Sequence, residues 1–95
     1  KYFTLTEIEY CLSKKNKFET IAGIYAAKEA VLKAFKIGIG NGISLKQVEI
    51  GHFDNIPFVA ENEMIKKLLK KENASQIDLS ISHSENLAIS ICIIN

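Results

Sequence analysis

The sequence contains few of the residues that mark specialised folds: 2 cysteines, 1 proline and 5 glycines among 95 residues. Cys11 and Cys92 are isolated, with no CxxC pair and no histidine at metal-ligand spacing. This pattern argues against a disulfide scaffold or a zinc site and favours a reducing, cytosol-like compartment. The low proline and glycine content, with 47% hydrophobic residues, indicates a globular chain and excludes a disordered tail or a fibre.

Excess charge and long apolar runs are also lacking. Lysine plus arginine number 12 and aspartate plus glutamate 11, so the net charge is +1, which is too small for a nucleic-acid-binding surface. No apolar run approaches the roughly 20 residues that span a bilayer, and no charged-then-apolar leader opens the chain. We therefore expect neither a nucleic-acid partner nor a membrane segment. The length fits a single domain over residues 1–95, with a core so small that neighbouring copies could support it.

Sequence periodicity predicts three helices. Thr6 and Glu9 match a capping box, so a first helix is expected over residues 6–14. Residues 18–36 contain one glycine and no proline, and they should form the longest helix. Residues 61–72 have the amphipathic pattern of a third helix, with lysines on the outer face.

Alternation of apolar and polar residues predicts the strands. Residues 77–82 and 87–93 alternate strictly and are expected to form an antiparallel hairpin. Residues 43–50 suggest a strand whose alternation changes phase, so a bulge or turn is expected within it. Residues 56–60 suggest a short strand whose proline favours an edge or a strand start. The expected fold class is α+β, an antiparallel sheet with helices packed on one face.

One carboxylate interrupts the apolar pattern of the longest helix. The residues expected to face the core are Phe18, Ile21, Ala22, Tyr25, Glu29 and Leu32. A buried, unpaired Glu29 would cost several kcal/mol, so it needs a cation, a hydrogen-bond donor or a metal. Lys33 follows one turn later, and an ordinary Glu–Lys helix pair is the simplest alternative. A functional role is favoured because the two residues lead directly into a glycine-rich loop.

The glycine-rich loop places Gly38, Gly40 and Gly42 within five residues. Glycines allow backbone N–H groups to approach an anion, so the loop, together with Lys33 and Lys36, could hold phosphates. A helix end followed by a hairpin turn is the more common alternative. The loop matches neither the dinucleotide fingerprint nor the Walker pattern.

A serine-rich strand end carries a histidine. Ser80 and Ser82 share one face of the expected strand, and His83 is expected to begin the turn. A catalytic Ser–His pair is disfavoured because sequence neighbours rarely form a nucleophile and its base, and no acid is placed to orient the ring. The alternative is that His83 is an ordinary hydrogen-bonded turn residue. The other histidine, His52, has no neighbouring feature that suggests more than such a structural role.

The order and spacing of four motifs resemble the holo-(acyl carrier protein) synthases, the small phosphopantetheinyl transferases of fatty-acid synthesis. The motifs are Ala-Ala-Lys-Glu-Ala at 26–30 with Lys33, Gly-Ile-Gly at 38–40, Ile-Ser-Leu-Lys-Gln-Val-Glu-Ile at 43–50, and Ser-Ile-Ser-His-Ser at 80–84. The resemblance spans residues 4–94. It implies transfer of the 4′-phosphopantetheine arm of coenzyme A to a serine of acyl carrier protein, with release of adenosine 3′,5′-bisphosphate and a requirement for Mg²⁺.

The resemblance also implies residue roles. Glu29 corresponds to a Mg²⁺ ligand, which would explain a carboxylate in an apolar stripe. Lys28 corresponds to the motif lysine near the reacting centre, and Lys33 to the lysine on the coenzyme A phosphates. The residues implied to contact coenzyme A are Lys33, Gly38, Gly40, Ser82 and His83. The metal and the lysines would neutralise the pyrophosphate while a hydroxyl attacks in line.

The sequence departs from the family pattern at two places. Family members open with a Gly-Ile-Asp strand whose Asp is a second metal ligand, so we expect this chain to be a family domain that lacks its first strand. Ile24 and Tyr25 stand where the family usually has Arg-Phe, so an ion pair or anion contact expected there is absent.

The resemblance further implies partners and a location. Known members form trimers with active sites between subunits, which would relieve the small core of this domain. The expected location is the cytoplasm. The basic segment 14–17 resembles the region that docks the acidic helix of acyl carrier protein, although such a segment is more often a solvated face. The alternative function is a non-catalytic α+β binding or oligomerisation module in which the pair of Glu29 and Lys33 is structural.

Overall fold

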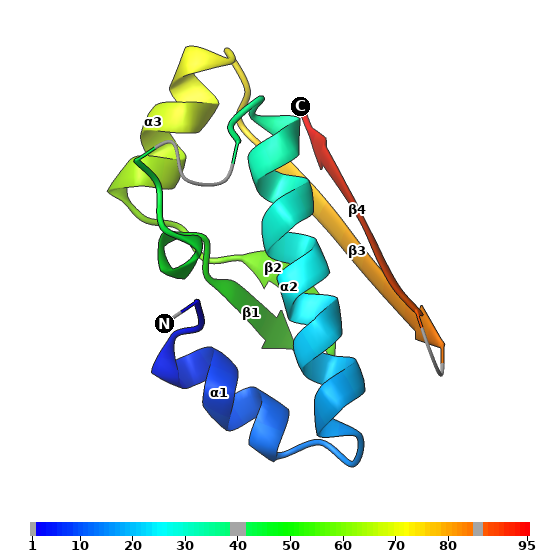
Figure 1. The fold of residues 1–95 in the computed structure, drawn as a ribbon. Helices are drawn as coiled ribbons and strands as arrows, with labels where there is room; N and C mark the ends of the chain where they lie inside the picture. Colours follow the sequence, from blue (N-terminus) through cyan, green and yellow to red (C-terminus); the bar gives the residue numbers. More distant parts are fainter. Residues whose placement is uncertain (1, 39–41, 85–86) are drawn as a thin grey trace.

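The computed structural model describes residues 2–38, 42–84 and 87–95. These ranges contain three α-helices, one short 3₁₀-helix and four strands: α1 (Leu5–Leu12), α2 (Lys17–Ala34), η1 (Leu45–Gln47), β1 (Ile50–Phe53), β2 (Ile56–Val59), α3 (Glu63–Lys71), β3 (Ile77–Ser84) and β4 (Leu87–Ile94). The strands form two separate two-stranded antiparallel sheets, β1–β2 and β3–β4 (Figure 1). The predicted α+β class is confirmed. No helix in the described ranges is long and apolar enough to cross a membrane.

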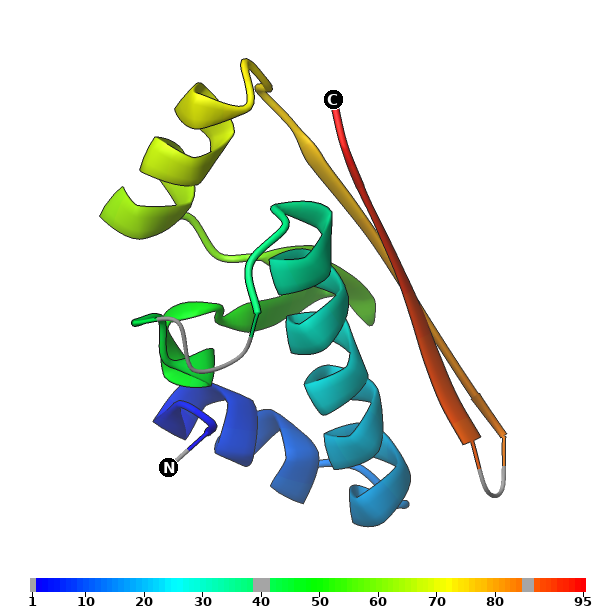
Figure 2. The same ribbon diagram turned by 45° about the horizontal axis from the view of Figure 1, so that its top comes forward.

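Helix α2 is the centre of the molecule. It lies between the long β3–β4 hairpin on one side and α1 with β1 on the other (Figure 2). Its buried apolar side chains are Ile24, Ala27, Val31, Leu32 and Phe35. These pack with Cys11 and with Leu45, Val48 and Ile50 of the segment that follows α2. The opposite face of the hairpin carries the exposed side chains of β4.

The predicted core-facing stripe of α2 is mostly wrong. Phe18 is 87% exposed, Ile21 37% and Tyr25 38%, whereas Leu32 is fully buried. Apolar residues occur around most of the circumference of α2, and the helix is covered on two sides. One stripe of 100° spacing therefore could not identify the buried face. Glu29 is half-buried.

Helix α1 begins earlier than its predicted cap. Thr4, and not Thr6, is the N-cap, and its hydroxyl accepts the backbone N–H of Glu7 at 3.2 Å. The carboxylate of Glu7 accepts the N–H of Thr4 at 2.8 Å, which completes the capping box. The sequence contains two overlapping Thr-x-x-Glu patterns. The first one forms because Glu7 also has buried partners elsewhere in the fold, described below.

Helix α2 does not end at a glycine. Lys36 adopts the left-handed conformation with φ of 62°, and the N–H of Ile37 bonds to the carbonyl of Leu32 at 2.8 Å. The N–H of Lys36 bonds to the carbonyl of Lys33 at 2.9 Å, which gives the Schellman pattern. The helix predicted over residues 18–36 therefore ends two residues earlier than expected, at Ala34.

The strand predicted over residues 43–50 is wrong except at Ile50, whereas the turn expected within it is present at residues 45–47. Ser44 and Gln47 form a capping box around η1, and β1 starts only at Ile50. The carbonyls of Leu45 and Val48 point to a side chain of α2 and are not part of a ladder. The change of phase in the apolar pattern marks this helical turn.

The two hairpins follow their sequence signals. Asp54 and Asn55 have φ of 50° and 64°, as a two-residue type I′ turn requires between β1 and β2. Pro57 lies in β2, a strand of a two-stranded sheet, as predicted. The predicted β3–β4 hairpin is confirmed, with His83 inside β3 opposite Ala88 and not at the start of the turn.

Candidate functional site

The second half of α2 presents an acid and a base whose side chains have no partner among the described residues. Glu29 is half-buried and Lys33 is exposed in the last turn. No ion pair joins their side chains, and neither side chain bonds to another described residue. The ordinary Glu–Lys helix pair considered from the sequence does not form. Both groups are therefore free to meet a ligand.

The carboxylate of Glu29 fits a role as one Mg²⁺ ligand. Mg²⁺ keeps several waters and is usually bound through one or two carboxylates together with substrate phosphates. A half-buried carboxylate with no described cation beside it is such a group. Within the described ranges, no group of three His, Cys, Asp or Glu residues could hold a metal ion. Glu29 would therefore supply one ligand, and substrate oxygens or other groups the remainder.

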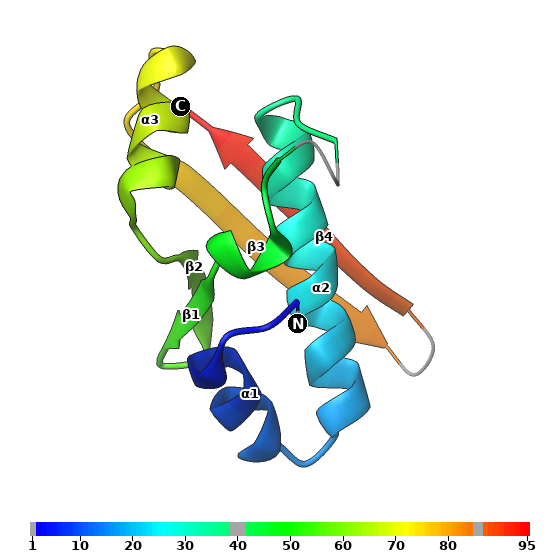
Figure 3. The same cartoon turned by 60° about the vertical axis from the view of Figure 1, so that its left-hand side comes forward.

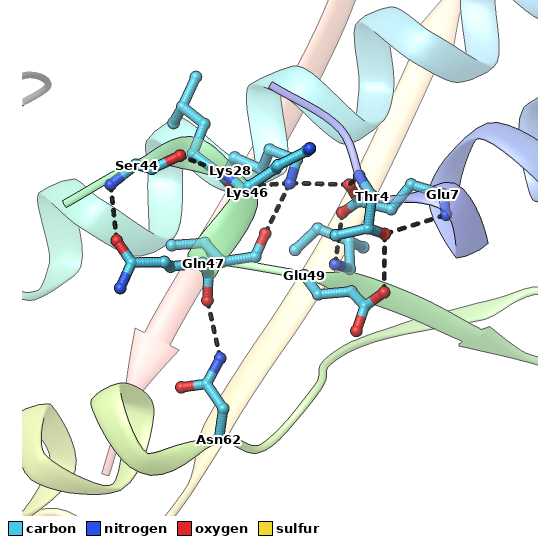
Figure 4. Close-up of polar contacts among 11 residues, drawn as sticks. Thr4, Glu7, Lys28, Ser44, Lys46, Gln47, Glu49 and Asn62 are labelled. Atoms are coloured by element: carbon cyan, nitrogen blue, oxygen red, sulfur yellow. Dashed lines mark hydrogen bonds and ion pairs between the residues drawn. The ribbon is translucent and has the colours of Figure 1, made fainter. Parts of the chain in front are cut away.

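Lys28 is buried and all its N–H donors are engaged. Its side chain is 0% exposed, and Nζ lies 2.9 Å from Glu7 Oε1. The same ammonium donates to the carbonyls of Leu45 and Val48, each at 2.8 Å (Figure 4). An ammonium has three donors, so none remains for a substrate in this arrangement. Burial lowers the pKa of Lys28, and the hydrogen bond and charge of Glu7 oppose that shift.

The glycine-rich loop is described only in part. Gly38 is exposed and lies outside any helix or strand, and Gly42 is exposed with φ of 83°. Gly40 lies outside the described residues. Gly38 follows the last turn of α2, which carries Lys33, so these two predicted coenzyme A contacts lie near each other along the chain.

Ser82 and His83 lie on opposite faces of the β3–β4 hairpin, as successive strand residues do. His83 faces α2, where its Nδ1 lies 2.9 Å from Glu19 Oε1. Ser82 is exposed on the outer face, opposite Ile89. A Ser82–His83 nucleophile pair is therefore excluded by geometry. Glu19 orients His83 and was not predicted; its only sequence signal is its position three residues after the helix cap Asn16.

The predicted site residues form two groups in a single copy of the chain. His83 packs against Gly23, at which an added methyl group would lie 3.2 Å from His83 Cδ2. At 1.5 Å per residue, Glu29 lies about 9 Å and Lys33 about 15 Å further along α2 from Gly23. Glu29, Lys33 and Gly38 thus belong to one end of α2, and Ser82 and His83 lie beside the other.

Two hollows flank the His83 end of the hairpin. One, of about 420 Å³, is lined by Asn16, Phe18, Glu19, Ala22, Ser84, Leu87 and Ala88. The other, of about 220 Å³, includes His52, whose ring stacks on Tyr10 at 3.8 Å between centroids. The Nδ1 atom of His52 is buried and has no partner among the described residues. Burial lowers the pKa of His52, and the charge of Lys14 lowers it further.

The fold and the free acid and base on α2 agree with a sequence comparison. The family model of the 4′-phosphopantetheinyl transferase superfamily matches residues 1–92, so the chain belongs to this superfamily. It is an enzyme of the phosphopantetheinyl transferase class, which disfavours the alternative of a non-catalytic module.

Curated relatives define the type within this superfamily. Holo-[acyl-carrier-protein] synthase of Finegoldia magna is 40% identical over 94 residues, which cover 99% of this chain and 74% of the relative. The enzyme of the same name from Fusobacterium nucleatum is 42% identical over 97 residues, covering 99% and 78%. The predicted resemblance to holo-(acyl carrier protein) synthases is confirmed.

Solved structures support the same conclusion. The holo-[acyl-carrier-protein] synthase of Helicobacter pylori, in complex with coenzyme A, matches with a TM-score of 0.81 and 28% identity, covering 99% of this chain and 77% of that one. The Neisseria meningitidis enzyme matches with a TM-score of 0.84 and 25% identity, covering 99% and 76%.

Proposed function

We propose that the chain transfers the 4′-phosphopantetheine arm of coenzyme A to a serine of apo acyl carrier protein, as part of fatty-acid biosynthesis. The serine oxygen forms a bond to the phosphorus that carries the arm. The bond from that phosphorus to the adenosine 3′,5′-bisphosphate breaks, and the serine proton passes to solvent or a base. The observation that carries the proposal is that Glu29 and Lys33, on α2 of a phosphopantetheinyl transferase, have no side-chain partner in the part of the chain that the structure describes.

Each free side chain has a defined task in this reaction. Lys33 binds the phosphates of coenzyme A and offsets their negative charge, beside the backbone of Gly38 and Gly40. Glu29 holds Mg²⁺, which supplies charge neutralisation at the pyrophosphate when bound. Gly38 and Gly40 serve the nucleotide end of coenzyme A, and Ser82 and His83, the latter oriented by Glu19, also contact coenzyme A.

We further propose that the active site is shared between copies in a homotrimer. One copy keeps the Glu29 group and the His83 group at opposite ends of α2, so a second copy could bring the two groups to one ligand. The outer face of β4 exposes four apolar side chains, Leu87 at 60%, Ile89 at 52%, Ile91 at 59% and Ile93 at 54%. A continuous apolar strand face of this kind is typical of a protein interface.

A charge on this strand face tests the assembly. Ile91→Lys is expected to convert the trimer to a monomer in light scattering, because a lysine there would be buried without a partner. Ile56→Lys is the matched control, since Ile56 is 64% exposed on the other sheet. A monomeric wild type, or a trimer of Ile91→Lys, would contradict the proposed assembly.

The basic segment 14–17 is proposed to dock acyl carrier protein in the cytoplasm. Lys15 and Lys17 are exposed, while Lys14 donates to Asn55 Oδ1 at 2.6 Å and lies over the Tyr10 ring. Clustered lysines attract an acidic partner and raise its association rate. Both cysteines are free thiols, as suits a reducing compartment.

A direct assay tests the transfer. The protein is incubated with coenzyme A, Mg²⁺ and apo acyl carrier protein. Mass spectrometry is expected to show the carrier gaining one phosphopantetheine arm, and a chelator is expected to stop the gain. A folded, competent carrier that gains no mass would refute the proposed function.

A further inference from the structure

A buried network joins three segments of the chain around Glu7 and Lys28. Both side chains of the Glu7–Lys28 ion pair are 0% exposed. The second carboxylate oxygen of Glu7 accepts the N–H of Ile50 at 2.7 Å. Lys28 bonds to two carbonyls of residues 45–48, as described above. The pair therefore ties α1, α2 and the segment leading into β1 to one another (Figure 4).

Further contacts hold the same segment in place. The hydroxyl of Thr4 donates to Glu49 Oε2 at 2.7 Å, and Asn62 Nδ2 donates to the carbonyl of Gln47 at 2.8 Å. Residues 44–50 pass beside α2 between α3 and α1 (Figure 3). Every polar atom of the Glu7 and Lys28 side chains thus has a partner. A fully satisfied buried network of this kind fixes one arrangement of its elements.

The network lies next to the free carboxylate of the proposed site. Glu29 follows Lys28 directly, so its side chain leaves α2 about 100° around the helix axis from the tethered one. Because the Lys28 ammonium is bound on three sides, α2 cannot rotate without breaking those bonds. A small rotation of α2 would redirect Glu29, and misplacement by about 1 Å can cost 10²-fold in rate.

We propose that Glu7 and Lys28 are positioning residues: the buried pair fixes the rotation of α2 against residues 45–50 and so directs the Glu29 carboxylate at the substrate. This inference rests on the proposed function. It assigns no chemical step to Lys28 itself. It adds Glu7, a residue of α1 that touches no proposed ligand, to the residues on which the rate depends.

The test removes both charges together, because removing one alone would leave a buried, unpaired charge. The double variant Glu7→Gln with Lys28→Met is made in the full-length protein. Ile94→Ala is the matched control, since it removes packing from the β4 end of the hairpin at a half-buried position on the other side of α2. All rates are measured at a temperature well below the unfolding midpoints of every variant.

The double variant is expected to lower kcat at least about tenfold with little change in the KM for acyl carrier protein. It is also expected to accelerate amide exchange of Ile50, whose N–H bonds to Glu7. Ile94→Ala is expected to keep the wild-type kcat and the slow amide exchange of Ile50, even if its unfolding midpoint falls as far as that of the double variant. A wild-type kcat in the folded double variant would overturn the proposal.

Two further results keep the proposal open to refutation. If the double variant does not fold, the isosteric Glu7→Gln variant is measured in the same way, and a lowered stability with an unchanged kcat would overturn the positioning role. If the wild type itself transfers nothing, the proposed function fails. Amide exchange then still tests the buried network, because unchanged exchange at Ile50 in the double variant would show that the Glu7–Lys28 pair does not hold this segment in place.

Discussion

The close approach of β3 to α2 at Gly23 gives a prediction with two opposing energies. A methyl group on Gly23 would lie 3.0 Å from Ile81 Cγ2 and 3.2 Å from His83 Cδ2. Alanine is favoured over glycine inside a helix by about 0.8–1.0 kcal/mol. Overpacking a tight contact costs about 1–3 kcal/mol. Gly23→Ala should therefore lower the free energy of unfolding by roughly 0–2 kcal/mol, because Ile81 is held in a paired strand.

This substitution should also displace His83 from Glu19. In thermal unfolding followed by circular dichroism, a loss of about 1 kcal/mol lowers the midpoint by roughly 4–8 °C in a domain of this size. Calorimetry is expected to show weaker coenzyme A binding, because the imidazole no longer keeps its 2.9 Å contact with Glu19.

A second glycine supplies the control for this prediction. A methyl group on Gly51 would lie 2.5 Å from Phe58 Cζ, yet the Phe58 side chain is 47% exposed and can rotate into solvent. Gly51→Ala should change stability by less than about 1 kcal/mol and leave coenzyme A affinity unchanged. A higher unfolding midpoint for Gly23→Ala, with wild-type affinity for coenzyme A, would refute the reasoning. Helix propensity alone would then determine the change in stability, and the contact with β3 would cost nothing.

Three other changes test local features of the fold. The pKa of His52 lies below its usual 6.5 because of burial and the charge of Lys14. The neutral imidazole therefore contributes stability above pH 6.5, and this contribution is lost as the pH falls through the lowered pKa. His52→Phe should reduce the drop in melting temperature between about pH 7.5 and 5, and an unchanged drop would contradict this. Thr4→Ala should cost about 1–2 kcal/mol in urea unfolding, because it removes a helix cap and the bond to Glu49; a loss below 0.3 kcal/mol would count against it. Lys36→Gly should raise the melting temperature by relieving up to about 1 kcal/mol at φ of 62°, and a fall would show that this backbone is not strained.

Short-range sequence patterns correctly predicted the helices and strands that neighbouring residues are enough to specify. The β3–β4 hairpin, α3 and the edge strand with Pro57 were predictable because alternation and turn residues specify them. The alternative caps of α1 could not be distinguished locally, because the choice of Thr4 over Thr6 depends on the buried partners of Glu7. Those partners come from segments more than 20 residues away.

The same limit applies to α2 and to the segment after it. A helix packed on two sides shows no single apolar stripe, so its buried face could not be predicted from Phe18, Ile21 and Tyr25. The segment of residues 43–50 was expected to form a strand, but the carbonyls of Leu45 and Val48 accept hydrogen bonds from Lys28, a long-range interaction that no local pattern indicates. Glu29 was singled out from the sequence because a carboxylate among apolar residues is a local anomaly, and its role stays a prediction.

The central claim is that Glu29 serves the transfer reaction. The most direct test compares the transfer rates of Glu29→Gln and Glu9→Gln in the full-length protein, since Glu9 is an exposed glutamate of α1. Loss of a group that stabilises developing charge typically costs about 10²–10³ in kcat. Glu29→Gln is expected to lose at least about 100-fold in rate with an unchanged melting temperature, while Glu9→Gln keeps the wild-type rate. Full transfer by folded Glu29→Gln would contradict the claim.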